Sequence, residues 1–172
     1  MPEIIIVAGP NGAGKTSFAR QYFGRLGTRY TFVNADEIAR ELPEAVSPQM
    51  RRDIEAARHM LLRMEQLASA SQDFVVETTL SALTYVEKVK AWQRQGYRVV
   101  LIFLRLPSAD HAIDRVRRRV ASGGHSIPEF TIRRRFDQGR EYLERHYKHA
   151  VDEWYIWDSL EGDFELKEAW DD

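Results

Sequence analysis

The chain has 172 residues, 44% of them hydrophobic, which suffices for one domain with a packed core. It contains no cysteine, and this excludes disulfides, zinc–thiolate sites, iron–sulfur clusters and thiol nucleophiles. Lysine and arginine number 25 against 26 acidic residues, so the formal net charge is -1 and no global positive field attracts nucleic acid. We therefore expect a single domain over residues 1–172 that binds small molecules and no nucleic acid.

No segment of the sequence predicts membrane insertion or export. The longest apolar stretch runs from Val99 to Leu104, far short of the roughly 18 residues that a membrane-spanning helix needs. Glu3 stands where a signal peptide carries basic residues, and the apolar run that begins at Ile4 follows directly. We expect a cytoplasmic protein that does not bind membranes.

The apolar pattern alternates between short β-rich runs and stretches with helical spacing. The runs predict strands at 3–9, 31–33, 74–76, 97–104 and 150–157, with 164–166 as a candidate edge strand. The helical stretches are 14–23, 35–42, 50–68, 81–94, 108–121 and 129–146. Because strand 97–104 is apolar on both faces, it is typical of a central strand in a parallel sheet covered on two sides. The order predicts an α/β fold of three layers around a mainly parallel sheet of five strands.

Two of the expected helices carry further signals. Asn34 is a candidate N-cap for helix 35–42, because acidic residues follow it in the first turn. In helix 50–68, the apolar residues that repeat at steps of three and four are Met50, Ile54, Ala57, Leu61, Met64 and Ala68. This stripe predicts an amphipathic helix that packs this face against the core.

The motif that carries chemistry is Gly9–Thr16, which reads G-P-N-G-A-G-K-T and matches the P-loop pattern G-x-x-x-x-G-K-[ST] between a strand and a helix. Its glycines let successive N–H groups wrap around phosphates, and the helix that follows adds its positive end. Lys15 then places a charge on the β- and γ-phosphates, and Thr16 offers a hydroxyl to Mg²⁺. The expected nucleotide-binding residues are Gly9, Asn11, Gly12, Ala13, Gly14, Lys15, Thr16 and Ser17.

The P-loop serves kinases, ATPases and GTPases, so the rest of the chain must decide among them. The sequence has no N-K-x-D segment of the kind that reads guanine. A chain of 172 residues also leaves little room for a coupled mechanical domain. A small kinase suits this length.

A kinase needs carboxylates at the same edge of the sheet as the P-loop. Glu77 ends the expected strand 74–76 at this edge and is the candidate magnesium ligand, whereas Asp73 lies at the opposite end. Asp36 follows the second strand at a helix start, where the helix dipole keeps a carboxylate ionised. It is the candidate base for the proton of the acceptor hydroxyl. The alternative is that Asp36, or Asn34, only caps the helix.

Phosphoryl transfer also needs positive charge that closes over the γ-phosphate and excludes water. Arg115 and Arg119 lie four residues apart on one face of an expected helix, and Arg133–Arg135 begin the next helix beyond a glycine pair. We expect the region of about 115–135 to form a helical lid, with at least half of its arginines solvated. His125 either contacts a phosphate or finishes the turn.

Four segments together resemble the zeta-toxin-type P-loop kinases. They are the P-loop, N-A-D-E at 34–37, E-T-T-L-S at 77–81, and G-G-H-S-I-P at 123–128 followed by I-R-R-R-F at 132–136. The resemblance covers almost the whole chain and implies a P-loop kinase fold. Family members of the toxin kind use ATP or GTP to phosphorylate the 3′-hydroxyl of UDP-N-acetylglucosamine. For the toxin subtype, the resemblance implies an antitoxin protein as partner.

The resemblance also implies roles for individual residues. Asp36 would be the base, Lys15 the phosphate-binding lysine and Thr16 the magnesium ligand. Glu77, Thr78 and Thr79 would lie at the acceptor, and Arg115, Arg119 and Arg135 would hold phosphates. The chain departs from the family pattern at 157–160, which reads W-D-S-L where many relatives carry D-N-S, and at the E-T-T segment, which is E-G-T in the plasmid toxins.

The sequence thus predicts an ATP- and Mg²⁺-dependent phosphotransferase with an alcohol group as acceptor. A UDP-sugar such as UDP-N-acetylglucosamine is the first choice. One alternative is a nucleoside, nucleotide or other metabolite kinase. An alternative of another class is a nucleotide-binding toxin–antitoxin module without transfer activity.

Overall fold

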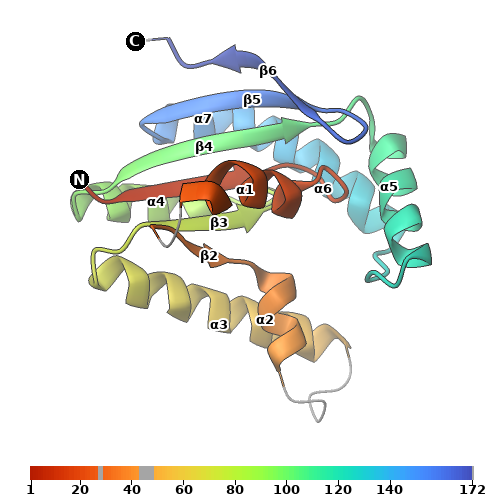
Figure 1. Cartoon of the computed structure of the whole chain (residues 1–172), viewed down its shortest axis with the longest axis horizontal. Coiled ribbons are helices and arrows are strands. Elements are labelled where there is room, and N and C mark those ends of the chain that lie inside the picture. The colour runs from red at the N-terminus through yellow and green to blue at the C-terminus, as the bar shows by residue number, and fades with distance from the viewer. Residues whose placement is uncertain (27–28, 43–48, 172) are drawn as a thin grey trace.

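The computed structural model describes residues 1–26, 29–42 and 49–171, and its centre is one twisted β-sheet (Figure 1). The strands are β1 (Glu3–Ala8), β2 (Thr31–Val33), β3 (Phe74–Thr78), β4 (Arg98–Arg105), β5 (Glu153–Ser159) and β6 (Phe164–Ala169). Their order in the sheet is β2-β3-β1-β4-β5-β6. All neighbouring pairs are parallel except β5 and β6, which are antiparallel. The carboxyl ends of the five parallel strands therefore meet at one edge.

The fold class is the predicted α/β class with a mainly parallel sheet, but the predicted count of five strands was wrong by one. The candidate edge strand 164–166 is a strand of six residues, β6, which turns back from β5. Its side chains are exposed from Glu165 to Ala169, because only β5 covers it. The five strands were predicted from continuous apolar runs, and an exposed strand such as β6 has no such run.

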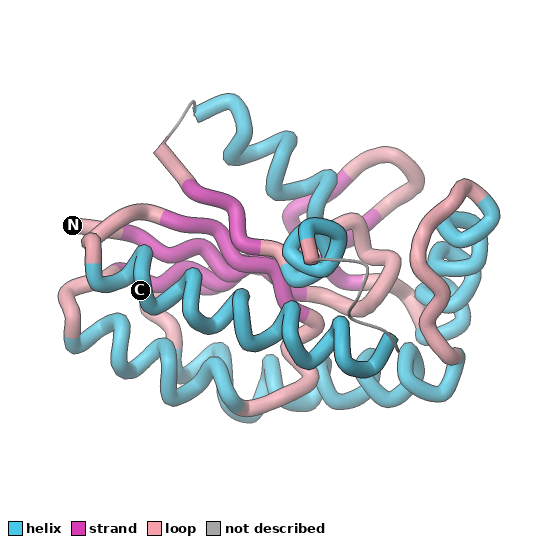
Figure 2. Tube along the Cα trace, turned by 90° about the horizontal axis from the view of Figure 1, so that it is seen from below, coloured by secondary structure: helices cyan, strands magenta, loops and turns pink. Residues whose placement is uncertain are grey.

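Helices lie on both sides of the sheet (Figures 1 and 2). The α-helices are α1 (Lys15–Phe23), α2 (Ala35–Glu41), α3 (Gln49–Ser69), α4 (Thr84–Arg94), α5 (Ala109–Ala121), α6 (Glu129–Tyr142) and α7 (Lys148–Ala150). A 3₁₀ turn, η1 (Gly24–Leu26), follows α1, and a π-helical turn, η2 (Leu143–Tyr147), joins α6 to α7. Of the helices in the described ranges, none combines the length and the apolar character of a bilayer-spanning segment.

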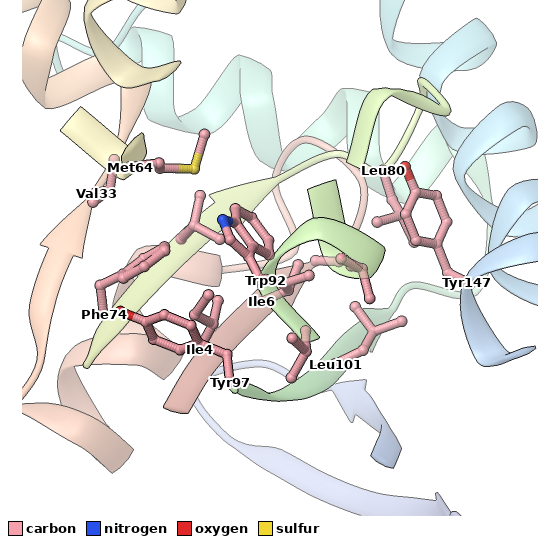
Figure 3. Packing of buried hydrophobic residues seen from close by; sticks show 14 of the residues in the cluster. Ile4, Ile6, Val33, Met64, Phe74, Leu80, Trp92, Tyr97, Leu101 and Tyr147 are labelled. Carbon is pink, nitrogen blue, oxygen red and sulfur yellow. The ribbon is translucent and has the colours of Figure 1, made fainter. Parts of the chain in front are cut away.

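Two apolar cores lie on the two faces of the sheet, because alternate residues of β1 point in opposite directions. Ile4 and Ile6 pack with Met64 of α3 and Trp92 of α4, as Figure 3 shows. Ile5 and Val7 belong to the other core, which α1 and α5 cover with residues such as Phe18, Ala19, Ala112, Ile113 and Val116. This sandwich of helices, sheet and helices is the predicted three-layer arrangement.

The buried face of α3 differs from the predicted stripe. Met64 and Ala68 are buried as expected, but Ile54 is 55% exposed. The other buried residues of this helix are Ala56, Met60 and Leu67. Leu61 is partly buried against the same core, Ala57 is exposed, and the side chain of Met50 lies outside the described part of the chain. The observed and predicted stripes thus share Leu61, Met64 and Ala68, so helical periodicity alone does not distinguish them.

The predicted helix 129–146 is interrupted near its end. The α-helix stops at Tyr142, and the π turn that follows places Tyr147 in the core, where its hydroxyl donates to the Ala82 carbonyl. This contact joins η2 to the loop between β3 and α4. The predicted helix 81–94 also begins later, at Thr84, because this loop occupies its first residues.

Candidate active site

The P-loop lies between β1 and α1, at the edge where the parallel strands end. Gly12 and Gly14 have φ values of 82° and 83°, a left-handed conformation that glycine adopts without strain. At Gly9 an added Cβ would lie 2.5 Å from the Leu104 carbonyl oxygen, so the loop crosses the end of β4 with no room for a side chain. The backbone therefore has the shape of an anion-binding nest at a helix N-terminus.

Lys15 points back into this loop. Its Nζ donates to the carbonyl oxygens of Gly9, at 2.9 Å, and Pro10, at 3.0 Å. Burial lowers the pKa of Lys15 to about 8; the positive charges of Arg119 and Arg135 act in the same direction. An anion placed beside this partly buried ammonium group would favour its charged form.

Glu77 lies beside the P-loop at the end of β3 and is linked to two other polar side chains. Thr16 Oγ1 donates to Glu77 Oε2 at 2.8 Å, and Asn34 Nδ2 donates to the same oxygen at 2.7 Å. Asn34 Nδ2 also lies 3.2 Å from Thr16 Oγ1. Burial raises the pKa of Glu77, although the Thr16 hydrogen bond and Lys15 oppose the shift.

The oxygen atoms of this cluster fit a magnesium ion. Mg²⁺ prefers oxygen ligands and is bound in nucleotide enzymes by one or two protein groups together with phosphates and water. The Thr16 hydroxyl and the Glu77 carboxylate supply such a pair. Within the described residues, no group of three or more His, Asp or Glu side chains could hold a metal ion by itself. The donor set therefore suits an ion that arrives with phosphates.

Asp36 lies in the first turn of α2, and Asn34 caps this helix as predicted. The side-chain oxygen Oδ1 of Asn34 accepts a hydrogen bond from the Asp36 backbone N–H at 2.8 Å. Because Asn34 provides the cap, the Asp36 carboxylate is free of that role. Its side chain is exposed and borders a cavity of about 460 Å³.

This cavity lies between α2, the start of α3 and the α5–α6 loop. Its lining residues are Asp36, Ala39, Arg40, Arg52, Asp53, Arg119, Ser122, Gly123, Gly124 and His125. Three of them are arginines, and Arg52 also donates to the Ala39 carbonyl oxygen at 3.0 Å. The cavity thus places carboxylates and cations next to one another, and two of its lining residues, Asp36 and Arg119, also act electrostatically on Lys15 of the P-loop.

The three predicted phosphate-binding arginines occupy different positions. Arg119 lines the cavity and is close enough to Lys15 to lower its pKa. Arg135 Nη1 lies 3.5 Å from Asn11 Oδ1 of the P-loop. Burial lowers the pKa of Arg135, and the negative charge of Asp36 opposes this shift. Arg115 instead donates to Ser159 Oγ at 2.8 Å and to the Ser159 carbonyl oxygen at 3.1 Å.

Three of the remaining arginines of the region form surface ion pairs, as expected for a solvated half of the cluster, whereas Arg134 lies over the Phe130 ring at 5.8 Å. Arg118 pairs with Asp114 at 2.7 Å and with Glu161 at 3.2 Å, and its side chain is 58% exposed. Arg133 of α6 pairs with Asp110 of α5 at 2.6 Å, and Arg117 pairs with Glu129. The pairs of Arg133 and Arg117 link α5 to α6.

Thr78 ends β3, and Thr79 follows it at the start of a tightly held segment that leads to α4. Thr78 Oγ1 accepts a hydrogen bond from the Leu80 N–H at 3.0 Å, and the hydroxyls of Thr79 and Ser81 are 2.8 Å apart. Leu80 is fully buried and has a φ of 59°, which a leucine rarely adopts. An added Cβ at Gly139 of α6 would lie 2.6 Å from the Thr79 carbonyl oxygen. Packing from α6 therefore fixes this segment.

The structure brings most of the predicted site residues to one place. Lys15, Asp36, Glu77, Arg119 and Arg135 act on one another electrostatically. Asp73 lies at the opposite edge, as predicted, where its Oδ1 accepts from the Glu3 backbone N–H at 2.7 Å.

Sequence reasoning missed two connections in the site. The first is the link from Asn34 to Glu77, although the N-A-D-E segment was a signal for this position. The second is Ser159, whose Oγ donates to the Ala13 carbonyl oxygen at 2.7 Å. Its signal was the polar Asp-Ser pair at the end of a strand.

Comparisons with known proteins agree with this architecture. A family model described as an AAA domain (AAA_33) matches residues 4–146. An uncharacterized protein from Haemophilus influenzae is 27% identical over 136 residues, which cover 78% of this chain and 92% of that protein.

Two solved structures show the same fold. One comes from the PezAT chromosomal toxin–antitoxin system of Streptococcus pneumoniae, with a TM-score of 0.73 and 16% identity over 98% of this chain and 72% of that chain. The other is a gluconokinase from Sinorhizobium meliloti, with a TM-score of 0.55 and 20% identity over 93% of this chain and 84% of that chain. The chain therefore has a P-loop kinase-like fold.

Proposed function

The chain belongs to the AAA domain family AAA_33, and we propose that it is a phosphotransferase that moves the γ-phosphate of ATP or GTP to a hydroxyl group of a small molecule. One observation carries this proposal. Asp36 lines a cavity of about 460 Å³ and acts electrostatically on Lys15 of the P-loop and on Arg135, at the start of a helix that Asn34 already caps. A carboxylate in this position is close to both the proposed phosphate site and the proposed acceptor site.

The P-loop residues would bind and orient the triphosphate. The nest of backbone N–H groups holds the phosphates, and the Lys15 ammonium turns from the Gly9 and Pro10 carbonyl oxygens to a phosphate oxygen. The Thr16 hydroxyl and the Glu77 carboxylate would hold Mg²⁺, which when bound neutralises charge on the phosphates. Asn34 keeps Glu77 oriented through its 2.7 Å hydrogen bond.

Asp36 would accept the proton of the acceptor hydroxyl as the new bond to phosphorus forms. Arg119 and Arg135 flank the same space and would stabilise the charge on the transferred group. The α5–α6 region of about 115–135 would act as a lid that excludes water, so that the acceptor and not water receives the phosphate.

A UDP-sugar is the acceptor that we propose first. The cavity next to Asp36 carries Arg40, Arg52 and Arg119, which suit the charge of a diphosphate. The resemblance of the four segments to zeta-toxin-type kinases, and the likeness to the PezAT structure, support the same choice. In this case Thr78 and Thr79 would lie on the acceptor side, and an antitoxin protein would be the partner.

A different metabolite kinase is the second candidate. The gluconokinase structure supports this candidate, because the shared fold covers 93% of this chain and 84% of that one, so the two chains are similar in length. A polyhydroxylated acid is an acceptor that the arginine-lined cavity would also accept. A nucleotide-binding toxin–antitoxin module without transfer is distinguished from both kinases by the absence of any phosphorylated product.

The test compares Asp36→Asn with the wild type and with Asp114→Asn, a surface carboxylate paired with Arg118. Binding of Mg·ATP is measured by calorimetry. Transfer of labelled γ-phosphate is measured with UDP-N-acetylglucosamine, gluconate and a cell metabolite extract, and products are identified by mass spectrometry. We expect Asp36→Asn to bind nucleotide within about threefold of wild type and to lose at least about a hundredfold in transfer. Asp114→Asn should change neither.

Two results would contradict the proposal. An equal loss of binding and of transfer in Asp36→Asn would remove its role as base. Label that appears only as free phosphate with every acceptor would favour the module without transfer activity.

A further inference from the structure

Ser159 is buried at the carboxyl end of β5, and both hydrogen-bonding capacities of its hydroxyl are used. Among the described residues, Asn34 and Ser159 are the buried polar ones, and Ser159 is only 4% exposed. Its Oγ donates to the Ala13 carbonyl oxygen at 2.7 Å and accepts from Arg115 Nη1 at 2.8 Å. Arg115 Nη2 donates to the Ser159 carbonyl oxygen at 3.1 Å. A buried hydroxyl with two partners has one defined orientation.

The hydrogen bond to Ala13 fixes one peptide plane of the P-loop. In a trans peptide the C=O of one residue and the N–H of the next point in opposite directions. Because the Ala13 carbonyl points at Ser159, the Gly14 N–H is directed away from Ser159. Gly14, at φ 83°, is the residue before α1, so this N–H belongs to the anion-binding nest.

Arg115 supports the same loop from α5. Its Nη1 also lies 3.4 Å from the Gly12 carbonyl oxygen, and an added Cβ at Gly12 would lie 3.0 Å from Arg115 Cβ. Helix α5 therefore packs directly on the P-loop at this point. The sequence predicts that Arg115 holds a phosphate, but in the structure its guanidinium contacts oxygen atoms of the protein.

We propose that Ser159 and Arg115 are a positioning pair, which holds the P-loop in its anion-binding shape without contacting the phosphates. This inference rests on the phosphate site of the proposed function and on no particular acceptor. It makes the affinity for the triphosphate depend on the end of β5, a strand separated from β1 by β4. It also implies that the pair acts on any triphosphate, whatever its base.

The test measures binding of ATP and of inorganic tripolyphosphate, each with Mg²⁺, by calorimetry without an acceptor. The variants are Ser159→Ala, Arg115→Met and the double variant. We expect each single substitution to lower the affinity for both ligands by about tenfold, which corresponds to the loss of one hydrogen bond. The double variant should lose little more, because removal of either partner already breaks the pair. Ser159→Thr, which keeps the hydroxyl, should recover most of the affinity.

Arg118→Ala is the matched control, because Arg118 lies on the same helix and its described ion pairs are on the surface. It should bind both ligands as the wild type does. Thermal unfolding checks that each variant folds. If Ser159→Ala does not fold, Arg115→Met carries the same test without altering the buried serine.

Three results would overturn the pair. The first is a tripolyphosphate affinity within twofold of wild type in both single variants. The second is a loss of affinity for ATP but not for tripolyphosphate, which would mean that Arg115 contacts the nucleobase. The third is that the losses of the two single variants add up in the double variant. A wild-type chain that binds neither ligand would overturn the nucleotide site itself, whereas a failure of phosphoryl transfer leaves this experiment unaffected.

Discussion

Replacing Asn34 by alanine removes a helix cap and a hydrogen bond to a buried carboxylate in one step. Asn34 Oδ1 accepts from the Asp36 N–H at 2.8 Å, and Nδ2 donates to Glu77 Oε2 at 2.7 Å. Loss of an N-cap costs about 1 kcal/mol. Loss of a hydrogen bond to a charged group costs about 1.5–3 kcal/mol. We therefore expect Asn34→Ala to lower the free energy of unfolding by roughly 3 kcal/mol, which corresponds to about 6–12 °C in Tm for a chain of this size.

The control is Ser108→Ala, because Ser108 caps α5 and is remote from Glu77 in this network. Its Oγ accepts from the His111 N–H at 3.3 Å and lies 2.7 Å from the exposed His111 Nδ1, so its removal should cost about 1 kcal/mol and breaks no bond to a carboxylate. Urea denaturation at pH 7.5 measures both variants. Equal losses in the two would show that the bond from Asn34 to Glu77 contributes nothing and would refute the reasoning.

Asn34→Asp separates the two roles of this side chain. Aspartate caps helices as well as asparagine does, but it places a carboxylate oxygen where the amide donated to Glu77. Two carboxylates at that distance share a proton, which raises the pKa of the folded pair above the unfolded value of about 4. A raised pKa stabilises the folded state below the unfolded value, and this contribution is lost as pH rises through the folded value. The stability gap to wild type should therefore widen from pH 5 to pH 8; a gap that narrows would contradict this.

Two further predictions concern the phosphate site and the acceptor loop. Burial lowers the pKa of Lys15 to about 8, and bound phosphate raises it again, so tripolyphosphate binding should take up a proton near pH 8 and weaken as pH rises above 8. Calorimetry in two buffers of different ionisation enthalpy measures this uptake, and an affinity that stays constant to pH 9.5 would contradict it. Gly139→Ala should cost about 1–3 kcal/mol in urea denaturation, because its Cβ would lie 2.6 Å from the Thr79 carbonyl oxygen. The control is Gly24→Ala, which should be neutral or slightly stabilising because Gly24 has a φ of -64° and an added Cβ would meet nothing within 4 Å. If the two substitutions change the free energy of unfolding equally, α6 moves away from Thr79 without cost.

The fold was predictable because its central strands are continuous apolar runs. Strands such as β1 and β4 are buried on both faces, and burial of this kind leaves a clear pattern in the sequence. The exposed strand β6 leaves no such pattern. The buried face of α3 depends on where the helix meets the sheet, which its own periodicity does not contain.

The candidate site was predictable where one segment contains the whole signal. The P-loop is contiguous, and Glu77 follows from the rule that carboxyl ends of parallel strands share an edge. The role of Ser159 depends instead on contacts between segments far apart in the chain. The P-loop follows β1 and crosses the end of β4 at Gly9, and so it meets the end of β5, although β4 separates β5 from β1 in the sheet. Sequence spacing carries no information on that crossing.

The two edges of the sheet both carry charge clusters, but the pKa shifts at the candidate site differ in direction from those at the opposite edge. At the amino-terminal edge, Arg98 pairs with Glu3 at 2.8 Å and with Glu153. The Glu153 hydrogen bond raises the pKa of Arg98, and Arg98 lowers the pKa of Glu153, so each partner favours the charged form of the other.

At the P-loop edge, the pKa shifts of three site residues run the other way. Burial lowers the pKa of Lys15 and of Arg135, and it raises the pKa of Glu77. These groups are held where their charged forms are disfavoured, which costs stability in the free protein and is typical of a site that awaits an oppositely charged ligand. Tripolyphosphate with Mg²⁺ should therefore raise Tm by more in the wild type than in Lys15→Met, since the variant has already lost the buried ammonium that the anion relieves. Equal increases in Tm would show that the charges at this edge, like those at the other, only hold the fold together.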